Sequence, residues 1–218
     1  MNHTILSAFE NLPYFTIVGF RQIAGDEVAD DHHARVALHR WVKAERLIAL
    51  KKGVYMHPRF YERHRQEAAF SPVISAILLP QSYISLEYVL QQHGILTEIT
   101  YPVTAITIKN TRTITNPLGT FVYRHIQLDF YQGFQTAEAY GIPYAQASLA
   151  KALFDYLYLH PLPVNIKPQH YNLAEELRLN LDEFTSTERT EFAGYVANSG
   201  MVKMQLVLKN LESHIWRP

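Results

Sequence analysis

Basic side chains are concentrated in residues 31–66, and they are the first candidates for chemistry in this sequence. The stretch holds nine lysines and arginines against three acidic residues, a net charge of +6, although the 218-residue chain has no formal net charge. Residues 67–218 hold ten basic and thirteen acidic residues. A basic segment joined to a mildly acidic one favours an anionic partner for the basic part. A solvated charged face is the alternative interpretation.

Two of these lysines stand directly before a glycine. Lys51, Lys52 and Gly53 separate two short apolar segments, 47–50 and 54–56, that read as strands. Glycine adopts positive φ readily, so a tight hairpin with a basic tip is expected here. A basic hairpin tip suits contact with backbone phosphates. The alternative is an ordinary exposed hairpin whose lysines serve solubility.

The segment before this hairpin predicts a helix over residues 33–47, capped by Asp30 or Asp31. Its apolar side includes Leu38 and Trp41, and most of its basic residues lie elsewhere on the helix. We expect the helix to contact base edges and nearby phosphates, and the hairpin to contact phosphates alone. The candidate DNA-binding residues are Arg35, His39, Arg40 and Lys43 on the helix, with Arg46, Lys51 and Lys52 at the hairpin.

Other patterns that resemble chemical sites are weak. Residues 148–151 match S-x-x-K, a nucleophile pattern of some acyl-transfer enzymes, but S-D-N and K-T-G are missing. Residues 30–33, DDHH, have no second ligand cluster at metal-binding spacing, so helix capping explains the aspartates better. The chain has no cysteine, which excludes disulfides and thiolate sites. We therefore predict no catalytic residue, no metal site and no cofactor.

A winged helix-turn-helix would position the basic residues. Residues 3–12 and 17–24 have apolar side chains at helical spacing, Thr16 is a suitable N-cap for the second segment, and Gly25 ends it. The third helix and the basic hairpin follow. In a winged helix-turn-helix the third helix enters the major groove and the wing lies against the DNA backbone. We therefore expect residues 1–60 to form a winged helix-turn-helix DNA-binding domain.

The remainder, residues 61–218, predicts a second domain of mixed α/β structure with a small sheet and several helices. Strands are expected at 102–110 and 119–126, with a turn at Asn116-Pro117 between them. Helical patterns occur at 71–79, 85–92, 146–159, 174–184, 186–200 and 200–215. The predicted fold class of the whole chain is therefore α+β.

Three segments of the second domain resemble a known family. They are SYISLEYVLQQHGI, VTAITIKNTR with GTFVYRHI, and YAQASLAKALFDYLYL. Together with the N-terminal LHRWVKAERLIALKKGVYM, they resemble the AbiEi antitoxins of type IV toxin–antitoxin systems. The resemblance extends from about residue 15 to about residue 159 and depends on loose apolar patterns. Where the family pattern has an acidic residue before the lysine, this chain has Ala150, whereas the aspartate, Asp155, is kept.

The resemblance implies an N-terminal AbiEi-like winged helix that binds inverted repeats in its own promoter and represses it. It implies a C-terminal antitoxin domain that counteracts a nucleotidyltransferase-like toxin, with or without direct contact, in a phage-defence operon. The alternative is a stand-alone transcriptional regulator whose second domain senses a ligand or mediates dimerisation. The sequence has no signal-peptide pattern and no apolar run long enough for a membrane span, so we expect a cytoplasmic protein.

Overall fold

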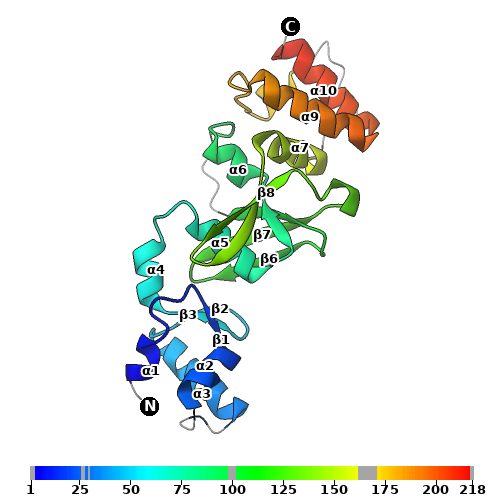
Figure 1. Ribbon diagram of the computed structural model, residues 1–218. Helices are drawn as coiled ribbons and strands as arrows, with labels where there is room; N and C mark the ends of the chain where they lie inside the picture. The colour runs from blue at the N-terminus through cyan, green and yellow to red at the C-terminus, as the bar shows by residue number, and fades with distance from the viewer. Residues whose placement is uncertain (1–2, 26–27, 29, 98–101, 162–170, 217–218) are drawn as a thin grey trace.

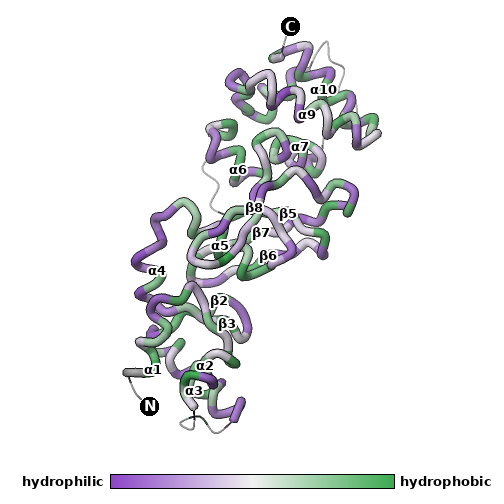
Figure 2. Tube along the Cα trace, in the orientation of Figure 1, coloured by the Kyte–Doolittle hydropathy of each residue, from purple (hydrophilic) through white to green (hydrophobic). Residues whose placement is uncertain are grey.

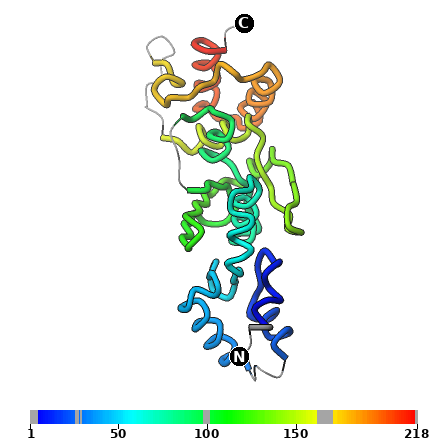
Figure 3. Tube along the Cα trace, turned by 90° about the vertical axis from the view of Figure 1, so that its left-hand side faces the viewer, coloured from blue at the N-terminus to red at the C-terminus, as the bar shows by residue number. Residues whose placement is uncertain are grey.

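The computed structural model describes residues 3–25, 28, 30–97, 102–161 and 171–216. The fold is α+β, as predicted, and the molecule is elongated (Figure 1). A small N-terminal helical unit lies at one end, a larger sheet lies in the middle, and the C-terminal helices lie at the other end. A view turned by 90° gives the same order (Figure 3).

The N-terminal unit contains three helices and a three-stranded antiparallel sheet in the order β1-β3-β2. Its helices are α1 (His3–Ser7), α2 (Ile17–Ala24) and α3 (Asp31–Lys43). Its strands are β1 (Phe15–Thr16), β2 (Ile48–Lys51) and β3 (Val54–Met56). The element order is the predicted one, with a short additional strand, β1. Two helices, α1 and α3, end earlier than expected.

Local sequence signals set the ends of α2 and α3. The Thr16 side chain accepts a hydrogen bond from the Gly19 amide (3.2 Å), and Asp30 Oδ1 accepts one from the His33 amide (2.8 Å). Both residues therefore cap their helices as predicted. The apolar faces meet in a separate small core, where Phe20 packs edge-on against Trp41 with ring centroids 5.5 Å apart. Ile23, which helical spacing placed on the apolar side of α2, is instead exposed.

The second unit is built on a six-stranded mixed sheet in the order β6-β7-β5-β4-β9-β8. Its strands are β4 (Ser82–Ile84), β5 (Val103–Thr107), β6 (Arg112–Asn116), β7 (Gly119–His125), β8 (Phe134–Ala139) and β9 (Ile142–Ala147). The predicted small sheet thus has four more strands than the two that the sequence indicated. β5 pairs with β7 in parallel and with β4 antiparallel, while β4 and β9 run parallel.

Helices cover both faces of this sheet. On one face, the Tyr123 hydroxyl donates to the Ser75 carbonyl of α5 (Phe70–Leu78) at 2.9 Å. On the other face, the Tyr83 hydroxyl donates to Asp155 of α7 (Leu149–Leu159), and α6 (Glu87–Gln92) packs beside α7. Because successive side chains of a strand point to opposite faces of the sheet, the helices on the two faces pack against different sets of strand residues.

The C-terminal part is helical and packs onto α7. It contains α8 (Leu173–Glu176), α9 (Ser186–Ser199) and α10 (Val202–His214). A capping box between Thr185 and Glu188 precedes α9, which begins at the predicted residue 186, and Gly200 ends it in the left-handed conformation. A short 3-10 helix, η2 (Leu128–Phe130), lies between β7 and β8.

The two units are joined by α4 (Pro58–His64), which Figure 2 colours as hydrophilic over most of its length. The hairpin also contacts the second unit directly, because Asn116 Nδ2 donates to the Leu50 carbonyl (3.0 Å). Val54 and Met56 of β3 belong to the large hydrophobic core of the second unit. The hairpin is therefore shared between the two units. Within the described ranges, no helix is long and apolar enough to cross a membrane.

Candidate functional site

The outward face of α3 carries the four helix residues that the sequence predicted for DNA contact. Arg35, His39, Arg40 and Lys43 are all exposed, whereas Ala34, Ala37, Leu38 and Trp41 are buried. Residues four apart lie on the same side of a helix, so Arg35, His39 and Lys43 form one row, with Arg40 beside it. In Figure 1, α3 lies at the end of the molecule far from the C-terminal helices. The structure thus brings these four side chains together on an accessible face.

Acidic residues near this face have other partners. Asp31 accepts from Arg21 at 2.6 Å, and Asp30 accepts from the amide and the ring of His33. Those hydrogen bonds lower the pKa of Asp30 and keep it ionised as a helix cap. Among the described residues, no ion pair or side-chain hydrogen bond joins Arg35, Arg40 or Lys43 to an acid. The positive charge of the α3 face is therefore available to an anionic partner.

Lys51 does not lie free at the hairpin tip, and this prediction was wrong. The turn consists of Lys52 and Gly53, with Gly53 at φ 78°, while Lys51 is the last residue of β2. The register of β2 against β3 shifts between Ala49 and Lys51, and such an irregularity changes the direction in which the next side chain points. Its ammonium donates to the carbonyls of Ile77 (2.8 Å) and Leu78 (2.9 Å), at the last turn of α5.

This position makes Lys51 a structural residue. A cation satisfies the free carbonyls of a helix C-terminus and complements its dipole. Burial, followed by the nearby charge of Lys109, lowers the pKa of Lys51. Lys52 is exposed in the turn and keeps the predicted position at the tip.

Arg46 lies in the turn between α3 and β2, after Glu45, which has a positive φ of 57°. It is exposed and lines a hollow of about 260 Å³ together with Glu10, His57 and Arg59. Arg59 pairs with Glu10 there at 2.8 Å. Arg46 is thus placed at the connection between α3 and β2, and not on the hairpin where the sequence reading put it.

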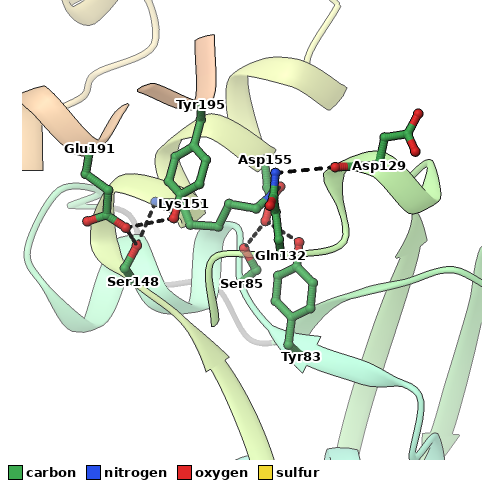
Figure 4. A network of polar contacts seen from close by, with 9 residues as sticks. All are labelled: Tyr83, Ser85, Asp129, Gln132, Ser148, Lys151, Asp155, Glu191 and Tyr195. Carbon is green, nitrogen blue, oxygen red and sulfur yellow. Dashed lines mark hydrogen bonds and ion pairs between the residues drawn. The ribbon is translucent and has the colours of Figure 1, made fainter. Parts of the chain in front are cut away.

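A second polar site lies inside the second unit, and the sequence reading missed it (Figure 4). Lys151 and Asp155, one turn apart on α7, form an ion pair whose side chains are 1% and 0% exposed. Asp155 Oδ2 also accepts from the hydroxyls of Tyr83 (3.0 Å) and Ser85 (2.8 Å). Three donors therefore converge on a carboxylate that has no contact with solvent.

Aromatic rings enclose the ammonium of this pair. Lys151 Nζ lies 5.0 Å from the centre of the Phe154 ring, 5.6 Å from that of Tyr83 and 5.7 Å from that of Tyr195. Cation–π attraction compensates part of the lost hydration. Burial lowers the pKa of Lys151 and raises the pKa of Asp155, because both charged forms are removed from water.

The S-x-x-K pattern is not a catalytic dyad in this geometry. Ser148 Oγ donates to Glu191 Oε1 at 2.6 Å and accepts from the Lys151 amide at 3.1 Å, so it caps α7. The Lys151 ammonium bonds to Asp155 instead. Glu191 also accepts from the Tyr195 hydroxyl at 2.8 Å, and burial raises the pKa of Tyr195 to about 12. The network links α7 and α9, and every group in it has a structural partner.

Gly133 completes the packing around this network. Its φ is 76°, and a Cβ at this position would lie 2.3 Å from Tyr195 Oη and 2.9 Å from Lys151 Cδ. A glycine is needed here for the backbone conformation and for the close approach. A sequence signal for the site did exist, since Lys151 and Asp155 interrupt the apolar face of α7 at a spacing of four.

Among the described residues, no group of three or more His, Cys, Asp or Glu side chains is arranged to hold a metal ion. Comparison of the chain with protein-family models and with curated proteins gave no match.

Proposed function

We propose that this chain is a DNA-binding transcriptional repressor that reads double-stranded DNA with α3. The observation that carries the proposal is the α3 face, where Arg35, His39, Arg40 and Lys43 are exposed together. In this proposal α2 and α3 form the helix-turn-helix and β2–β3 the wing. Arginine recognises guanine edges through paired hydrogen bonds, and lysine or arginine binds phosphates.

The hairpin would contribute less than the sequence suggested. Lys52 would contact backbone phosphate, whereas Lys51 would hold the hairpin against α5. Arg46, at the end of α3, would contact phosphate next to the helix. Inverted repeats in the protein's own promoter are the proposed target, and cytoplasm is the proposed compartment.

The test is binding of the full-length protein to its own upstream DNA and to a scrambled duplex, measured by fluorescence anisotropy at several salt concentrations. We expect a preference for the upstream duplex and a steep fall of log K with log salt, about 0.9 per neutralised phosphate. Arg35→Ala with Arg40→Ala should abolish the preference. Lys209→Ala, at an exposed position on α10, is the matched control. Weak binding that is equal on both duplexes would refute the proposal.

We propose, from the AbiEi resemblance, that the second unit carries antitoxin activity against a nucleotidyltransferase-like toxin. Co-expression with a toxin of this class, encoded beside the protein, should restore growth. Restored growth in the Arg35→Ala, Arg40→Ala variant would assign the activity to the second unit. DNA binding without any rescue would favour the stand-alone regulator, whose second unit senses a ligand or mediates dimerisation.

A further inference from the structure

A small pocket of about 90 Å³ lies where α6, α7 and β7 meet, and none of its lining residues belongs to the two sites described above. Its lining residues with polar groups are Glu87, Arg124, Tyr156 and His160, and Leu86 and Pro161 belong to its apolar wall. The pocket combines one carboxylate and one guanidinium, which is the charge pattern of a site for a molecule with both charges.

The carboxylate of Glu87 is incompletely satisfied. Its Oε2 atom is buried and, in the part of the chain that the structure describes, has no hydrogen-bond partner. A buried acceptor without a partner is costly and rare in a folded protein. An ammonium or N–H group of a ligand in the pocket would satisfy this oxygen.

Arg124 provides the complementary charge. It lies on β7 opposite Ile106 of β5, so its side chain leaves the sheet on the side of α6 and α7. It is exposed, and across the described ranges its guanidinium forms neither an ion pair nor a hydrogen bond, including with Glu87. Lys203, the other cation nearby, already donates to the carbonyls of Tyr158 (2.7 Å) and His160 (2.8 Å). Arg124 is thus the group that is free to bind a ligand carboxylate.

The backbone beside Glu87 is strained. Leu86 has φ 61° and ψ −141°, a conformation that a residue with a side chain rarely adopts, and it is buried. Such strain persists where the surrounding structure enforces it, often beside a ligand. Here it occurs at the residue that precedes the unsatisfied carboxylate.

We propose that this pocket binds the head group of a free α-amino acid. The ligand's ammonium would donate to Glu87 Oε2, and its carboxylate would accept from Arg124. A simple amine would leave Arg124 without a partner, and a simple carboxylate would leave Glu87 Oε2 without one. The pocket is smaller than the ~150 Å³ cavity that accommodates benzene, so it encloses a head group and the side chain of the ligand lies outside it.

The experiment uses the full-length protein and does not depend on DNA binding. The free L-α-amino acids are tested one by one by saturation-transfer NMR and calorimetry up to about 10 mM, which covers Kd values near 1 mM. The best binder is then compared with its N-acetyl and carboxamide derivatives, each of which lacks one of the two charges. We expect each derivative to bind about tenfold more weakly or worse.

Two variants test the protein side of the contact. Glu87→Gln and Arg124→Gln should each weaken binding about tenfold or more, and the exposed Glu138→Gln and Arg112→Gln should leave it unchanged. Circular dichroism checks that each variant folds, and the derivatives test the same contacts on the unaltered protein. The proposal is overturned if no amino acid binds, if the N-acetyl derivative binds as well as the free amino acid, or if folded Glu87→Gln binds normally.

Discussion

The substitution Lys151→Met tests the buried ion pair of Figure 4. It keeps most of the side-chain volume but leaves the Asp155 carboxylate, 0% exposed, with only the hydroxyls of Tyr83 and Ser85 as described partners. Removing one partner of a buried pair costs about 3–5 kcal/mol, because an uncompensated charge stays inside the protein. For a chain of this size, about 2–4 °C of Tm per kcal/mol gives a loss of roughly 6–20 °C.

A double variant separates the lost charge from lost packing. Lys151→Met with Asp155→Asn removes both charges, and the amide can still accept from the two hydroxyls. We expect it to be more stable than Lys151→Met alone, because replacing a buried pair by neutral groups is often close to neutral in free energy. The two single variants and the double variant form a thermodynamic cycle that isolates the interaction.

The assay is urea unfolding followed by tryptophan fluorescence. The chain has two tryptophans, and Trp216 packs against Phe184 and Phe192 in the second unit. In a Trp41→Phe background, Trp216 therefore reports on the unit that contains the pair. The reasoning fails if the free energy of unfolding of Lys151→Met lies within about 1 kcal/mol of that of the parent protein. It also fails if the double variant loses as much unfolding free energy as the two single variants together.

Three further predictions concern single positions. Lys51→Met should lower the unfolding midpoint in urea, because it removes the cation at the end of α5. Lys52→Ala should leave stability unchanged and reduce the slope of log K against log salt for DNA binding by about one unit. Equal stability of the two variants would contradict the structural role of Lys51. Gly133→Ala should destabilise by more than about 1 kcal/mol in thermal unfolding because of its positive φ and the close tyrosine hydroxyl, while Gly194→Ala, in open space on α9, should stabilise by up to about 1 kcal/mol. Burial lowers the pKa of His160 below its ordinary 6.5. As pH falls below 6.5, His160 therefore binds a proton in the unfolded chain before it does so in the folded chain, and the free energy of unfolding should decrease. His160→Gln should reduce this loss of stability at acidic pH, and an unchanged pH profile would refute the assignment.

Helices were the more predictable part of the fold. Asp30 and Thr16 each cap the helix that the sequence placed after them, because a capping side chain acts on its own next turn. Ser148 caps α7, which begins three residues later than the predicted segment. The strands were harder. β8 and β9 have mostly exposed or half-buried residues and few β-branched ones, so no alternation marks them. β4, only three residues long and wholly buried, exists because β5 and β9 pair with it from distant parts of the chain.

The candidate sites show the same difference between local features, which were predictable, and long-range contacts, which were not. The α3 face follows from helical periodicity, which is local, so the positions of Arg35 and Arg40 were predictable. The partner of Lys51 lies 26 residues away in sequence, and nothing near the hairpin indicates it. Burial of Lys151 and Asp155 likewise depends on Tyr83 and Ser85, about 70 residues earlier.

The hydrogen bonds from Lys51 to the last turn of α5 couple the N-terminal unit to the second unit. The hairpin that follows α3, the helix that we propose to read DNA, is also part of the second unit's core. If α3 binds DNA as we propose, a molecule that binds the second unit and displaces α5 would change the affinity for DNA. By thermodynamic reciprocity, DNA would change the affinity for that molecule by the same factor.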